Sequence, residues 1–224
     1  MGLTSSISLY LDFTLSIIEG NKIVRKEHTR QTCVSCRSDK MARAFLNQPI
    51  KIDQRKQRSH AKLFDTLVQK YREGTDFKAI EIQQFCQDAG VSRATFYRHY
   101  QNLADVISVH FLIVINDFEQ QIDALEQADF THSSAIVVSE IEANLDLIRL
   151  VRWSGNQAEV QSILSGTAQQ ILILRDYPQA RRQFISDFLG TMILKFAQEI
   201  VEAPEPIPTS QALELYRILI PHNL

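Results

Sequence analysis

The stretch from Ile80 to Tyr100, IEIQQFCQDAGVSRATFYRHY, predicts two short helices joined by a tight turn. The first is expected over Ile82–Asp88 and to end at Ala89-Gly90, because glycine adopts the left-handed conformation without a Cβ clash. Ser92 is placed to cap the second, Arg93 to about Tyr100, through its hydroxyl. A helix-turn-helix of this kind presents its second helix to the DNA major groove.

Charge is divided unevenly along the 224-residue chain, whose formal net charge is −2. From Lys51 to Arg98 there are ten lysines and arginines and six acids. From His99 to Ile148 there are nine acids and neither lysine nor arginine. This distribution indicates a basic module that meets polyanions, joined to an acidic one.

A helix is expected from about Gln54 to Tyr71, with one apolar face at three- and four-residue spacing. Its leading end is rich in basic residues. They form either a solubilising charge cluster or, beside a helix-turn-helix, an arm that holds DNA phosphates. The cluster comprises Arg55, Lys56, Arg58 and Lys62.

The segment from Gln54 to about Leu112 resembles the DNA-binding domain of the TetR family of bacterial transcriptional regulators, and AGVSRATFYRHYQNLADVI resembles that family's recognition segment. The resemblance implies an all-α fold. A three-helix helix-turn-helix DNA-binding head would occupy 51–101, followed over 102–224 by a helical-bundle domain that dimerises and often binds a small-molecule effector. We expect no cofactor and no metal.

The resemblance also assigns DNA contacts by position. Arg93 is expected to form a bidentate contact with guanine, and Thr95 to reach a base edge or a thymine methyl group. Tyr97 and His99 match positions that hold phosphates, whereas Tyr100 is expected to pack. The full expected DNA-binding set is Arg55, Arg58, Gln83, Ser92, Arg93, Thr95, Tyr97, Arg98 and His99.

Two positions depart from the family pattern. Leu103 stands where the family usually has a phosphate-binding lysine, and Glu81 stands where it usually has a threonine. A carboxylate near DNA repels the backbone, although it also complements a helix N-terminus. The departures suggest weaker or differently oriented operator binding.

The rest of the chain reads as helices over Asn102–Glu126, 136–153, 157–177, 180–201 and 210–220. The second of these is one helix or two that meet near Asn144, and 129–134 breaks the pattern. His110 lies on an apolar face as a core histidine or an effector ligand. Trp153 and Tyr177 either line an effector pocket or pack at helix ends.

The last two helices carry wide apolar stripes that predict a homodimer, with an intrachain core as the alternative. Gly190 would let another helix approach closely. In the TetR family, the last two long helices pair with their copies across a twofold axis. The expected interface comprises Phe184, Phe188, Met192, Phe196, Leu215 and Leu219.

The leading functional hypothesis is a cytoplasmic homodimeric repressor that an effector releases from a palindromic operator in double-stranded DNA. The alternative is an activator or co-regulator whose C-terminal domain binds a partner protein, as in a Gram-positive TetR-like subgroup that the end of the chain resembles. A helical enzyme is the remote alternative, because the sequence offers no catalytic motif. No membrane partner is expected.

The first fifty residues form a poorly defined N-terminal extension, in which Met41 is a possible translation start. Cys33 and Cys36 form one C-x-x-C without a second pair, and we interpret them as free thiols rather than as a zinc or redox site. The cysteine count favours a reducing compartment.

Overall fold

The computed structural model describes residues 54–124, 130–174 and 177–220, and every regular element in these ranges is helical. The fold is therefore all-α, as the sequence predicts. The N-terminal extension over 1–50, with Cys33, Cys36 and Met41, lies outside the described residues. Within the described ranges, no helix is both long and apolar enough to cross a bilayer.

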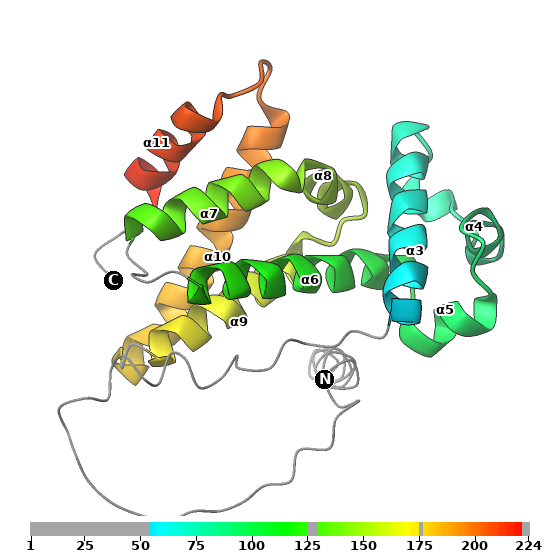
Figure 1. The fold of residues 1–224 in the computed structure, drawn as a ribbon, viewed down its shortest axis with the longest axis horizontal. Coiled ribbons are helices and arrows are strands. Elements are labelled where there is room, and N and C mark those ends of the chain that lie inside the picture. Colours follow the sequence, from blue (N-terminus) through cyan, green and yellow to red (C-terminus); the bar gives the residue numbers. More distant parts are fainter. Residues whose placement is uncertain (1–53, 125–129, 175–176, 221–224) are drawn as a thin grey trace, which may run out of the picture.

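Four elements, of which α3 is the longest, stand together at one end of the molecule (Figure 1). They are α3 (Gln54–Arg72), η1 (Phe77–Ala79), α4 (Ile82–Asp88) and α5 (Arg93–His99). Gly90 has a φ of 63° between α4 and α5, as predicted for the turn. Ser92 caps α5, since its Oγ accepts a hydrogen bond of 3.1 Å from the amide of Thr95.

The core of this end is aromatic and aliphatic. Leu63 and Leu67 of α3 are fully buried with Phe85 and Phe96, whose rings meet edge to face with centroids 6.3 Å apart. Such burial and ring geometry stabilise this small helical unit. The predicted inward orientation of Phe85 and Phe96 is confirmed.

Helix α6 (Leu103–Asp123) leads from this end into the remaining helices (Figure 1). It begins at a reciprocal capping box between Asn102 and Asp105. Helices α9 and α10 pack against each other, and α11 packs on α7. The bounds are α7 (Phe130–Ala143), α8 (Leu145–Trp153), α9 (Gln157–Leu174), α10 (Gln179–Glu202) and α11 (Thr209–Leu219).

The segment expected as one helix or two is two helices that meet at Asn144, as one alternative predicted. The prediction that 129–134 breaks the helical pattern is wrong from Phe130 onward, because α7 begins there. Arg217 of α11 stabilises this start by donating to Ser134 Oγ (2.9 Å) and to the carbonyl of Thr131 (2.8 Å).

Helices α9 and α10 approach each other closely at Gly190. A Cβ atom at this position would lie 2.8 Å from the backbone nitrogen of Ser165, which is too close for a real side chain. The expectation that Gly190 admits a neighbouring helix is confirmed, and the neighbour is α9 of the same chain.

Candidate functional site

One face of α5 presents basic and aromatic side chains to solvent. Arg93, Tyr97 and Arg98 are exposed, and Tyr97 retains 50% of its accessible surface. The Arg93 guanidinium carbon lies 5.9 Å from the centroid of the Tyr97 ring, which is cation–π distance. The face therefore offers a planar hydrogen-bond donor beside an aromatic hydroxyl, on a helix fixed by its cap.

The other expected DNA-binding residues differ in how exposed they are and in whether they already have a hydrogen-bond partner. Ser92 and Thr95 hydroxyls share a 2.9 Å hydrogen bond, so each is already partnered at the start of α5. Gln83 on α4 and Arg58 on α3 are exposed, and Arg55 belongs to the first turn of α3.

His99 at the end of α5 is half-buried. Burial, followed by the charges of Lys56 and Arg98, lowers the pKa of its imidazole below the usual range. A neutral His99 leaves the positive charge of this helix to Arg93 and Arg98. His99 would then contribute to a phosphate contact as a hydrogen-bond donor rather than as a cation.

The structure describes both positions at which the sequence differs from the TetR-family pattern. Leu103 is 6% exposed and belongs to the core, so its side chain is not available to a phosphate. Glu81 is exposed at the N-cap of α4, where its side chain makes no capping hydrogen bond. Its carboxylate stands on the same helix as Gln83, in the first half of the helix-turn-helix.

A chain of polar side chains lies beneath α5 and joins it to α3 and α6. His60 Nδ1 is 2.8 Å from the Tyr100 hydroxyl, and His60 Nε2 is 3.1 Å from His110 Nδ1. The His110 ring also stacks on Phe64, with centroids 3.5 Å apart. Charging both imidazoles would oppose two N–H groups across the 3.1 Å contact, so the pair favours a neutral state.

Burial reinforces this preference. It lowers the pKa of His60 to about 3, with a smaller contribution from His110, and lowers the pKa of His110 to about 4. Burial also raises the pKa of the Tyr100 phenol. His110 is thus a hydrogen-bonded core histidine, which was one of the two interpretations of this position.

Trp153 joins the end of α8 to the segment after α3. Its indole Nε1 donates a 3.0 Å hydrogen bond to the carbonyl of Thr75, and its ring meets Tyr71 and Phe77 edge to face. A nearby ion pair between Arg72 and Asp146, at 2.5 Å, ties the same two helices. Trp153 therefore packs at a helix end, as the second of its two interpretations proposed.

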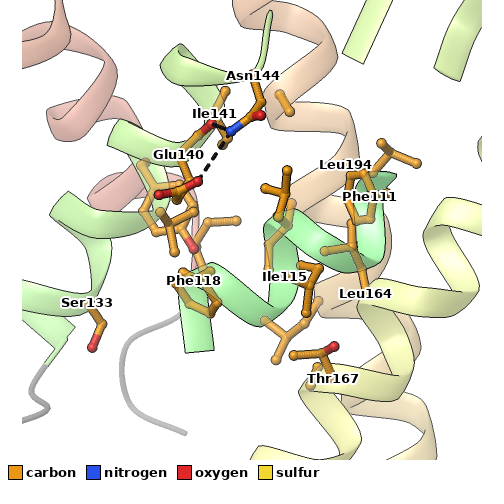
Figure 2. A pocket seen from close by; sticks show the side chains of 18 of the residues that line it. Phe111, Ile115, Phe118, Ser133, Glu140, Ile141, Asn144, Leu164, Thr167 and Leu194 are labelled. Carbon is orange, nitrogen blue, oxygen red and sulfur yellow. Dashed lines mark hydrogen bonds between the residues drawn. The ribbon is translucent and has the colours of Figure 1, made fainter. Parts of the chain in front are cut away.

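A cavity of about 620 Å³ lies among α6, α7, α9 and α10 (Figure 2). This volume is within the range of small-molecule sites. Its wall is largely aliphatic and aromatic, and Phe111, Ile115 and Phe118 of α6 line one side. Ile171, which is exposed, lies at its border.

Few polar groups reach the cavity. Glu140 of α7 accepts hydrogen bonds from Gln121 Nε2 (2.6 Å) and from Asn144 Nδ2 (3.2 Å), and Figure 2 shows Glu140 and Asn144 together at one side. Thr167 lines the cavity from α9. Tyr216 also lines it, and burial raises the pKa of its phenol to about 12.

The residues expected to form an effector pocket do not belong to this cavity. His110, Trp153 and Tyr177 do not line the cavity. His110 of α6 is held by its contact with His60 of α3, and Trp153 of α8 by its hydrogen bond to Thr75. The Tyr177 carbonyl accepts a 2.5 Å bond from Arg182. The available signal was the apolar stripe on α6 together with Glu140, the first acid after the apolar run 136–138 of α7.

The expected dimer residues divide into two groups. Phe184 and Phe188 stack on the outer face of α10, and Phe184 is 76% exposed. Leu219 is also exposed, next to Ile218, which is 70% exposed. Met192 and Leu215 are half-buried.

Phe196 does not belong to that outer face. It is 7% exposed and meets Tyr216 of α11 edge to face, with centroids 5.3 Å apart. Its inclusion in the dimer interface is corrected, because α11 of the same chain already covers it.

No family model matches the chain, and no curated protein matches it. Among solved structures, the chain is similar to the crystal structure of Lin0861 from Listeria innocua, determined to 2.8 Å. The two share 29% sequence identity with a TM-score of 0.71, over 76% of this chain and 93% of that one. The comparison supports the all-α architecture, which an experimentally determined relative also adopts.

Proposed function

We propose that this chain is a TetR-like, sequence-specific DNA-binding regulator of transcription that acts as a homodimer, most simply as a repressor. The observation that carries the proposal is the outer face of α5, where Arg93, Tyr97 and Arg98 project from a Ser92-capped helix. A rigid helix with exposed arginines suits the major groove, where guanine presents two acceptors that a guanidinium can contact at once.

The exposed apolar residues Phe184, Phe188, Ile218 and Leu219 support the homodimer. Exposed aromatic and aliphatic side chains that gather on helices favour association, because their burial removes apolar surface from water. A twofold dimer would carry two copies of α5, and these would read two half-sites of a palindromic operator.

The cavity supports release by an effector. A ligand that binds more tightly in one arrangement of the two heads shifts DNA affinity by that difference in binding energy. The contacts of Trp153 and Asp146 with the α3 end provide a physical connection between body and head.

The test is a fluorescence-anisotropy titration of the full chain against duplex DNA from the region upstream of its own gene. The affinity is expected to fall linearly with salt on logarithmic axes, because bound arginines and lysines release counterions from phosphates. A shuffled duplex of equal length should bind at least about a thousandfold more weakly. Equal binding of the two duplexes, or none at low salt, would overturn the proposal.

A second candidate, an activator or co-regulator that needs a partner protein, is favoured by one observation. The buried Leu103 and the exposed Glu81 remove two phosphate contacts from the head. If this candidate is right, specific DNA binding by the purified chain stays weak and becomes tight when a protein captured from cell lysate on the immobilised chain is added. Tight binding by the chain alone would contradict it.

A further inference from the structure

The wall of the cavity is mostly apolar, with Ser133, Asn144, Thr167 and Tyr216 as neutral polar side chains and, among the described residues, one carboxyl group. The group is the Glu140 carboxylate, which Figure 2 shows at one side of the cavity together with Asn144. Both of its oxygens accept hydrogen bonds, and both donors are neutral amides. Among the described residues that line the cavity, there is no lysine, arginine or histidine.

A carboxylate oxygen has room for more than one donor, so each oxygen of Glu140 can accept a further hydrogen bond from a ligand. A cationic donor would form the stronger, charge-assisted kind. An anionic ligand would instead bring a second negative charge beside Glu140, where the described wall residues supply no cation to offset the repulsion.

We propose that the cavity binds an aliphatic amine, with the hydrocarbon chain along the Phe111, Ile115 and Leu164 wall and the ammonium group at Glu140. The wall residues are supplied by α6 and α9, and Glu140 by α7. As an identification of the effector, this inference rests on the proposed regulatory function. As a statement about ligand chemistry, it is tested on the protein without DNA.

Asn144 connects the proposed position of the ammonium group to the start of α8. It occupies the break between α7 and α8, and its side-chain amide donates to both the carbonyl (2.8 Å) and the carboxylate (3.2 Å) of Glu140. An ammonium group at Glu140 would therefore lie beside the side chain of the residue at this break. Helix α8 continues from there to Asp146, which pairs with Arg72 at the end of α3.

The experiment is isothermal titration calorimetry of the full chain, without DNA, against octylamine, 1-octanol and octanoate below their aggregation concentrations. Octylamine is expected to bind roughly ten- to a hundredfold more tightly than octanoate, with octanol between them. Each methylene removed from the amine should weaken binding about fourfold. Equal binding of amine and octanoate, or no binding of any probe, would overturn the inference.

Two variants locate the site. Glu140→Gln preserves the shape of the side chain and should abolish the preference for amine over alcohol while alcohol binding persists. Glu214→Gln on the exposed face of α11 is the matched control, since it makes the same charge change away from the cavity. Should Glu140→Gln fail to fold by circular dichroism, Val137→Phe, which fills the cavity from α7, must weaken all three probes.

The amine test and the DNA test fail separately. Loss of amine binding in a protein that still binds its upstream duplex specifically overturns the ligand class and leaves the regulatory proposal standing. Amine binding that depends on Glu140, in a protein that binds no DNA, supports the ligand site and overturns its role as an effector site. An amine that binds the DNA-free and the DNA-bound protein equally, and so leaves DNA affinity unchanged, would also support the ligand site and overturn its role as an effector site.

Discussion

At the scale of single residues, the histidine pair beneath α5 is the feature with the sharpest physical consequence. The buried His60 and the half-buried His110 share a 3.1 Å contact, and His60 also meets the Tyr100 hydroxyl. Three segments that surround the candidate DNA-binding helix are therefore tied by groups that favour the neutral state. Protonation is costly there, because burial disfavours the charged imidazolium.

This predicts a pH dependence of the free energy of unfolding. The pKa values of His60 and His110 are about 3 and about 4 in the folded chain, below the ordinary 6.5. The unfolded chain therefore binds more protons below pH 6.5, and stability falls as the pH drops from 6.5 towards 4. The loss by pH 5.5 is about 1–3 kcal/mol for the pair.

Urea unfolding midpoints at pH 7.5, 6.5 and 5.5 measure this effect. The double variant His60→Leu, His110→Leu is less stable at every pH but should lose most of the pH slope. A wild-type midpoint that stays constant over this range would contradict the assignment of a neutral pair.

At the scale of elements, the closest helix contact is that of α9 with α10. Gly190→Ala would place a Cβ 2.8 Å from the Ser165 backbone nitrogen, which cannot rotate away, so the helices must separate. The free energy of unfolding should fall by about 1–3 kcal/mol, the usual cost of overpacking. Gly166→Ala is the control.

Gly166 lies within α9, and a Cβ there would meet nothing within 4 Å. Replacing it should be neutral or stabilising by up to about 1 kcal/mol, because alanine favours helix more than glycine does. Equal effects of the two substitutions in urea unfolding would show that helix propensity, and not the close approach, decides them.

The element boundaries show what sequence periodicity could and could not supply. The two helices around Gly90 and the break at Asn144 follow from local signals, namely a left-handed glycine, a serine cap and the ends of apolar stripes. The start of α7 does not, since 129–134 is rich in polar residues. Arg217, more than eighty positions later, donates the hydrogen bonds that stabilise it.

The same distance in sequence explains why the contacts of two expected effector-pocket residues could not be predicted. Trp153 and His110 have partners 78 and 50 positions away, Thr75 and His60, and a single sequence does not reveal such pairs. The apolar stripe of α6 is visible in the sequence and lines the cavity. The position of Glu140 in the cavity wall is not, because it depends on how α7 packs against α6.

At the scale of the whole molecule, the proposed homodimer would bring two copies of α5 to one DNA duplex. Phe184→Ser removes the most exposed aromatic side chain of α10, and the change occurs twice in a twofold dimer. The dissociation constant of the dimer should rise by more than about a hundredfold. Sedimentation velocity at several protein concentrations measures it.

Tyr97→Ser is the matched control for this prediction, because Tyr97 is an exposed aromatic residue at the other end of the molecule. It should leave the dimer intact. A Phe184→Ser protein that dimerises as the wild type does would place the interface elsewhere on the surface.

The most direct measurement of the central claim compares Arg93→Ala with Arg181→Ala in binding to the upstream duplex and to its single-base variants. Arg181 is an exposed arginine on α10, so both substitutions remove one surface charge. Arg93→Ala should cost about 1–3 kcal/mol and lose discrimination at one guanine in each half-site, whereas Arg181→Ala should retain both affinity and discrimination. Unchanged discrimination in Arg93→Ala, or equal losses in the two variants, would contradict DNA reading by α5.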